Sequence, residues 1–140
     1  MAQDILLELP KTAPFPTVWS FNVIDGETQY LAPLGTSHAI INFRGNASGT
    51  TLSSLLDNKM IVCRLLLRNG SKAFIPQTFF VDGVAHYPDF LNGIWRKSAT
   101  GNRMLELTFK FYKVGSSVFS LLSYAEYAPA DKRATPIINR

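Results

Sequence analysis

The sequence has little of three features that commonly hold or anchor a protein: cysteine, charge and long apolar runs. Only one cysteine, Cys63, occurs among the 140 residues, which excludes an intramolecular disulfide. No apolar run reaches the about 18 residues that a membrane helix needs, and the N-terminal residues lack the basic segment and apolar core of a signal peptide. We therefore expect a fold held by packing, made in a cytoplasm, with no membrane partner.

Charged residues make up 17% of the chain, below the about 25% of an ordinary soluble domain. Partners could cover part of such a surface, but a β-rich chain with many Gly, Ser, Thr and Asn residues has the same composition. The 14 basic and 10 acidic residues give a net charge of +4, and the only adjacent basic pairs are Arg96-Lys97 and Lys132-Arg133. This scattering predicts no nucleic-acid partner.

Alternating apolar and polar residues dominate the rest of the sequence. From Met104 to Lys113, the residues Leu105, Leu107, Phe109 and Phe111 fall on one face, as in a strand with one buried side. The same period, bounded by Gly and Asn turn signals, predicts further strands. These are a strand from Val18, His38 to Phe43, Met60 to Arg68, Ala73 to Ile75, Phe79 to Val81 and Val118 to Tyr124.

Short connections between these segments predict how some of them pair. Residues 113–117 contain Gly115, which favours an antiparallel hairpin between the strands on either side. Asn69-Gly70 favours a second hairpin with residues 73–75, and residues 51–57 form a short helical turn or a loop. The sequence thus predicts an all-β fold, either an antiparallel β-sandwich or a jelly-roll-like barrel.

Proline and apolar residues mark the two ends of the chain. Pro10, Pro14 and Pro16 favour an extended arm over residues 1–17, followed by a β-sandwich domain at 18–127 and a short tail at 128–140. Apolar side chains on such segments need a surface to cover them. The candidate contact residues are Ile5, Leu7, Leu9 and Phe15 in the arm, and Ile137 and Ile138 in the tail.

Residue types that carry chemistry are sparse. Asp82, His86 and Asp89 form at most a loose ligand set, no nucleophile motif occurs, and the spacing of the glutamates nominates no catalytic pair. Cys63 lies inside an apolar run, which favours a buried structural thiol. We expect no enzyme activity, no catalytic residue, no metal and no cofactor.

Aromatic residues are unusually frequent in one loop-rich stretch. Tyr87, Phe90 and Trp95 follow Phe79 and Phe80 there, interrupted by Pro76 and Pro88. Such side chains can anchor an interface or stack on sugar rings, and they can equally cap the core. Tyr87, Phe90 and Trp95 are therefore further candidate partner-binding residues.

The order of these elements is familiar. An apolar run ends in Asn69-Gly70 and is followed by residues 74–76, by Phe79 to Gly83, by Trp95 and by the strand from Met104 to Gly115, with a closing strand through Tyr124. From Trp19 to Tyr127, this order resembles β-domains of tailed-bacteriophage fibre and head-decoration proteins.

The resemblance implies a β-sandwich that trimerises about a threefold axis on the outer surface of a virion. Only about 17 residues precede the first strand, which departs from the fibre pattern and favours a capsid decoration (cement) protein. Its expected partners are two further copies and the major capsid protein or another virion protein. The alternative is a tail-fibre domain that binds a host receptor or surface glycan.

Overall fold

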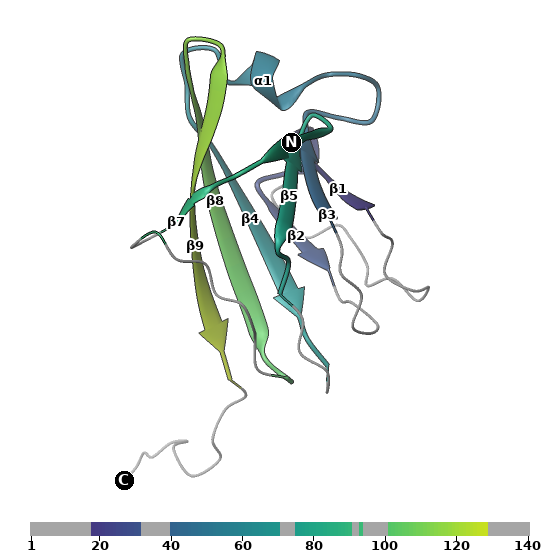
Figure 1. Cartoon of the computed structure of the whole chain (residues 1–140). Helices are drawn as coiled ribbons and strands as arrows, with labels where there is room; N and C mark the ends of the chain where they lie inside the picture. Colours follow the sequence, from purple (N-terminus) through teal and green to yellow (C-terminus); the bar gives the residue numbers. More distant parts are fainter. Residues whose placement is uncertain (1–17, 32–39, 71–74, 91–92, 94–100, 129–140) are drawn as a thin grey trace, which may run out of the picture.

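The computed structural model describes residues 18–31, 40–70, 75–90, 93 and 101–128. These residues form two packed sheets, sheet A with the order β1-β3-β5-β6 and sheet B with the order β2-β4-β8-β9-β7 (Figure 1). The two sheets pack face to face and do not close into a barrel, so the predicted all-β sandwich is confirmed. The elements are β1 (Val18–Asn22), the 3-10 turn η1 (Val23–Asp25), β2 (Thr28–Leu31), β3 (Ile40–Arg44), α1 (Leu52–Leu55), β4 (Ile61–Arg68), β5 (Thr78–Val81), β6 (Val84–His86), β7 (Asp89–Phe90), β8 (Met104–Val114) and β9 (Ser117–Tyr127).

Consecutive strands from β1 to β5 lie alternately in the two sheets. As a result, β1 and β3, β3 and β5, and β2 and β4 are parallel neighbours. A parallel pair needs a crossover, and here a strand of the opposite sheet takes the place of the usual helix. The expectation of an antiparallel sandwich is corrected accordingly: β4–β8, β8–β9 and β5–β6 are antiparallel, but both sheets are mixed.

A buried glutamine fixes the first corner between the sheets. The chain leaves β1, turns through η1 and Gly26, and enters β2 in the opposite sheet. The Gln29 side-chain amide donates to the carbonyl of Asn22 at 2.8 Å and to that of Gly26 at 3.2 Å. These bonds tie the end of β1 and the turn at Gly26 to β2, and they give the buried Gln29 amide the partners that a buried polar group needs.

The turn between β5 and β6 also holds the short helix α1 at the top of the view in Figure 1. Asp82 and Gly83 both have positive φ, at 52° and 81°, as a two-residue hairpin turn of the primed type requires. The Asp82 carboxylate accepts from the backbone N–H groups of Leu52 at 2.7 Å and Ser53 at 3.1 Å. One side chain therefore ties the tip of sheet A to α1.

The predicted hairpin between β8 and β9 is confirmed, with Gly115 at a φ of 64° in its two-residue turn. The hairpin predicted at Asn69-Gly70 is wrong over the described residues. From Arg64 to Leu67, β4 already pairs with β2 on one edge and with β8 on the other, and a strand has only two edges. Ile75 is not in a strand, and Ala73 lies outside the described residues.

Sequence periodicity missed three short strands, β2, β6 and β7, which have 4, 3 and 2 residues. Strands of this length show too few alternations to stand out from a loop. Residues 51–57 do include a helical turn, with Thr51 as its cap accepting from the Ser54 N–H. The predicted arm at 1–17 and the tail beyond residue 128 lie outside the described residues.

Aromatic side chains fill the space between the sheets. Phe43 of sheet A lies 4.5 Å from Phe109 and 5.0 Å from Phe111 of sheet B, measured between ring centroids. Phe21 and Phe79 extend this cluster to the neighbouring strands of sheet A. The other fully buried residues include Leu31, Ile41, Leu52, Cys63, Leu65, Leu67, Leu105 and Leu107.

The inward face of β8 gives a direct test of the core. Leu107 is fully buried, whereas Lys110 on the same strand is exposed. We expect Leu107→Asp to lower the free energy of unfolding by about 3 kcal/mol or more, because it places a charge between the sheets. Chemical denaturation measures this loss, with Lys110→Asp as the control, which should change stability by less than about 1 kcal/mol. Equal losses in the two variants would contradict the described register.

Candidate functional site

The outward face of sheet B carries many apolar side chains. In an antiparallel sheet with one solvated face, that face is usually polar. Here strands β8 and β9 expose Phe119, Leu121 and Tyr127, which are 39%, 45% and 52% accessible. We call this surface the outer face of sheet B. Its outward apolar residues are Tyr30, Val62, Leu66, Met104, Tyr112, Val114, Phe119, Leu121, Ala125 and Tyr127.

An aromatic pair lies near the hairpin end of this face. Tyr112 and Phe119 are direct cross-strand partners, and their rings stack with centroids 5.6 Å apart and planes 21° apart. Leu121 follows two residues along β9, on the same side. Cross-strand aromatic pairs stabilise a sheet by about 0.2–1 kcal/mol, but this pair still leaves apolar surface in contact with water.

Charged residues on the outer face are concentrated around Arg64. Its guanidinium lies 3.0 Å from a Glu106 carboxylate oxygen and 3.3 Å from one of Glu27. The Tyr127 hydroxyl donates to Glu106 at 2.7 Å, and this bond raises the pKa of Tyr127 above its usual value. The charges around Arg64 thus pair with one another. Lys110, which is exposed, is the direct cross-strand partner of Leu121, and the face is apolar again at Tyr112 and Phe119 beyond it.

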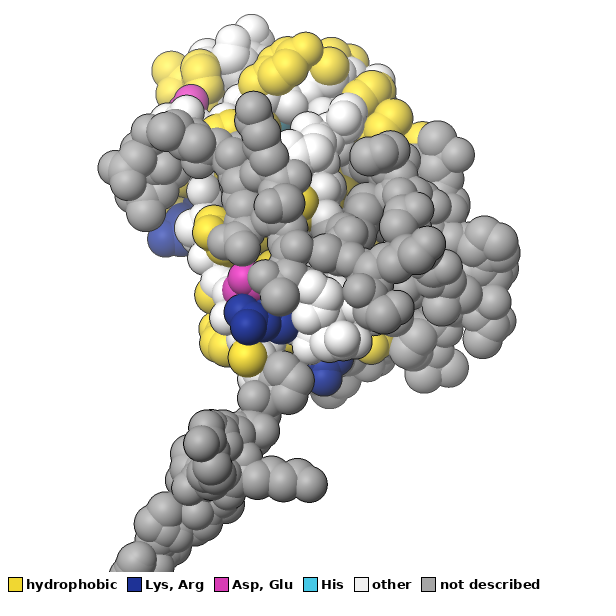
Figure 2. Space-filling model, turned by 60° about the horizontal axis from the view of Figure 1, so that its bottom comes forward, with side chains coloured by type: hydrophobic (Ala, Val, Ile, Leu, Met, Phe, Trp, Pro, Cys, Tyr) yellow, Lys and Arg dark blue, Asp and Glu magenta, His cyan; other side chains and the backbone are white. Residues whose placement is uncertain are grey.

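Figure 2 shows the molecule from the end opposite α1. On the described part of this surface, apolar side chains occur in several separate areas, while charged side chains gather at a few places. Low charge and exposed aromatic residues together are typical of protein interfaces rather than of surfaces that stay in water.

The edge of the sandwich beside β9 is closed by β6 and β7. These two strands cross from sheet A to sheet B, where β7 pairs with β9 (Figure 1). His86 of β6 and Ser120 of β9 share a hydrogen bond of 2.7 Å between Nε2 and Oγ. The His86 ring also lies 5.7 Å from Phe111. Burial lowers the pKa of His86 below its usual 6.5, and the charge of Asp89 opposes this effect in part.

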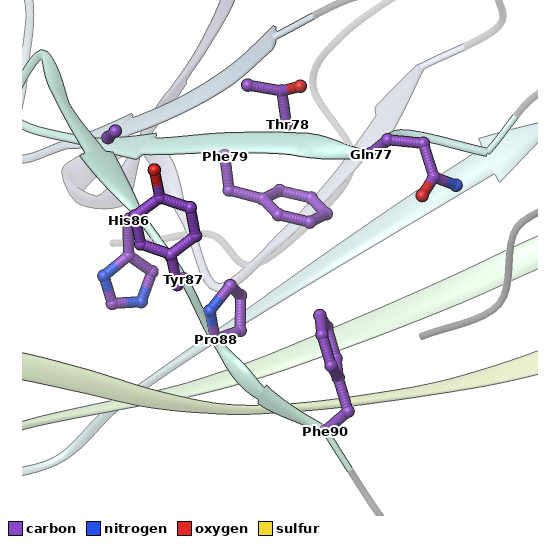
Figure 3. A pocket seen from close by; sticks show the side chains of 8 residues that line it. Gln77, Thr78, Phe79, His86, Tyr87, Pro88 and Phe90 are labelled. Carbon is purple, nitrogen blue, oxygen red and sulfur yellow. The ribbon is translucent and has the colours of Figure 1, made fainter. Parts of the chain in front are cut away.

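The contact residues that the sequence nominated divide into two groups. Tyr87 is 85% exposed and Phe90 is half-buried, and both line a cavity beside β6 and β7 (Figure 3). Ile5, Leu7, Leu9, Phe15, Trp95, Ile137 and Ile138 lie outside the described residues.

Sequence reasoning missed the outer face of sheet B. A signal was present in residues 118–122, where apolar residues occupy both faces of the strand: Val118 and Leu122 on one side, Phe119 and Leu121 on the other. A strand buried on one face only does not need the second set.

Groups that could carry chemistry have structural partners. Cys63 is fully buried on β4, as expected, and burial raises the pKa of its thiol. Asp82 holds α1, and Ser120, although bonded to His86, is only 1% exposed. The described residues contain no cluster of three His, Cys, Asp or Glu side chains that could hold a metal ion.

Comparison with protein families, with curated proteins and with solved structures finds no match for this chain. Within the described part, no helix is long and apolar enough to cross a membrane.

The burial of His86 predicts a pH dependence. Because the pKa of His86 is lower in the folded state, the unfolded chain takes up the proton first as pH falls below 6.5. We expect stability to decrease from about pH 6.5 down to the folded pKa, and the decrease to be smaller in His86→Asn. Denaturation midpoints at pH 7.5 and pH 5 measure both. An NMR titration of His86, assigned against His38→Gln, should give a midpoint below 6.5, and a midpoint at or above 6.5 would refute the prediction.

Proposed function

We propose that this protein is a structural protein that acts by assembly, and that copies of the chain contact one another through the outer face of sheet B. The observation that carries this proposal is the exposed apolar group of Phe119 and Leu121 beside the Tyr112–Phe119 stack. Removing such side chains from water is the main favourable contribution to most protein associations.

The size of the outer face suits this role. Strands β4, β8 and β9 have 8, 11 and 11 residues. At about 4.8 Å between strands and about 3.4 Å per residue, they cover a flat area on the order of 500 Å², which β2 and the side chains enlarge. A standard interface buries about 800 Å² on each partner.

A threefold arrangement suits an apolar ridge of this kind. Residues next to such an axis meet their own equivalents from the other two copies, so Phe119 and Leu121 would lie there, while the rest of each contact joins two different surfaces of neighbouring copies. The paired charges of Arg64, Glu27 and Glu106 would lie toward the rim, where charged residues cost least.

The specific form of the proposal is a homotrimeric capsid decoration protein of a tailed bacteriophage, located on the outer surface of the virion. It is supported by the order of strands and turns in the sequence. In this role, the trimer binds neighbouring capsid subunits, and repeated contacts add through multivalency.

Light scattering across a dilution series tests the assembly. We expect the purified full-length protein to have a mass of three chains, and Leu121→Ser to weaken association by about tenfold or more, since it removes a central apolar contact. Val84→Ser is the matched control, because Val84 is 68% exposed but lies on β6 of sheet A. Both variants should keep the free energy of unfolding of the single chain to within about 1 kcal/mol of the wild type.

A monomer at all concentrations, or equal effects of Leu121→Ser and Val84→Ser, would refute the proposed surface. If trimers form as expected, co-sedimentation of the protein with assembled capsids, but not with free capsid subunits, tests the decoration role.

A further inference from the structure

A cavity of about 400 Å³ lies beside the segment where β6 and β7 cross from sheet A to sheet B. This volume falls within the about 300–1,000 Å³ of typical small-molecule sites. Figure 3 shows the Phe79 ring directed into the cavity, facing Pro88 and Phe90. Phe79 also contacts Phe109 of the core, so the floor of the cavity is continuous with the packed interior.

The lining sets the charge of a ligand. The described lining residues include no Asp, Glu, Lys or Arg side chain. His86 is the only titratable group there besides Tyr87, and it is engaged with Ser120. An ion that entered this site would lose its water without gaining a partner of opposite charge, which is costly. The described part of the lining therefore favours neutral molecules.

The lining also favours a ring. The half-buried Phe90 and the exposed Tyr87 present ring surface to the cavity, while Phe79 and Pro88 are buried and form its floor. Aromatic rings pair well with such surfaces in offset or edge-on arrangements. Figure 3 places the Gln77 amide on the side of Phe79 away from Tyr87 and His86, so polar groups stand at both ends of the apolar wall.

Tyr87 marks the mouth of the cavity. Its ring is 85% exposed, and Pro88 restricts the backbone directly after it. An aromatic side chain held in water at the entrance of an apolar cavity loses that exposure when a ligand covers it. This is the pattern of a rigid aromatic contact in a binding site.

We propose that this cavity binds a neutral aromatic ring, which contacts the rings of Phe90 and Tyr87 above a floor formed by Phe79 and Pro88. The proposal does not depend on assembly through the outer face of sheet B. The ring can belong to a free small molecule or to a tryptophan side chain of a polypeptide, and the two sources differ in what is attached to it.

NMR titration of the full-length protein with indole tests this site. We expect a Kd on the order of 1 mM or tighter, the usual range for a ligand of this size, with the largest shifts at Ala85, His86 and Tyr87. Indole-3-acetate, which adds a charge to the same ring, should bind at least about tenfold more weakly. N-acetyltryptophanamide distinguishes the sources: tighter binding than indole indicates a polypeptide partner, and weaker binding a free molecule.

Tyr87→Ala supplies the decisive variant. Tyr87 lines the cavity and is 85% exposed, so the change removes a ring contact without entering the core. It should weaken indole binding at least about tenfold, while Val84→Ala, at an exposed residue of β6 that does not line the cavity, should leave it unchanged. Thermal unfolding checks that both variants fold. No shift up to the solubility limit of indole, or wild-type affinity in Tyr87→Ala, would overturn the proposal.

Discussion

Phe43 is the residue around which the two sheets are organised. It sits on the central strands of sheet A and contacts Phe21 beside it and Phe109 and Phe111 across the interface. Strand β3 pairs in parallel with both β1 and β5. In this register, Phe43 lies directly beside Phe21 on one neighbour and Val81 on the other. The aromatic cluster thus spans three strands of sheet A and joins them to β8 of sheet B.

Much of this architecture follows from residue patterns. The alternation in residues 104–113 identified β8 and its inward face, and Gly115 identified the hairpin to β9, because both signals are local. Pairing between distant strands has no local signal. That β4 lies between β2 and β8 depends on which apolar faces cover each other across the whole molecule, so Asn69-Gly70, a sound turn signal by itself, gave a wrong partner.

The candidate sites were predictable to a different degree. Tyr87 was nominated because aromatic residues are frequent in a loop-rich stretch interrupted by prolines, and it is largely exposed. Phe119 and Leu121 were not nominated. Their exposure depends on the register of β9 against β8, which turns Ser120 and Leu122 inward, and on the single short strand β7 that pairs with β9 within the described residues. Composition alone cannot tell which face of a doubly apolar strand is covered.

The alternation of strands between the sheets also has a consequence for the order of folding. Neighbours in sheet A, such as β1 and β3, are about 20 residues apart in sequence, and β4 finds β8 only some 40 residues later. The β8–β9 hairpin, by contrast, closes through two residues. Loop-closure entropy favours the shortest connections first, so the C-terminal hairpin is the natural nucleus. During synthesis, strands β1 to β4 leave the ribosome before this hairpin does. Until the hairpin forms, β4 lacks β8, its partner in sheet B, and the apolar faces of the earlier strands stay in contact with water.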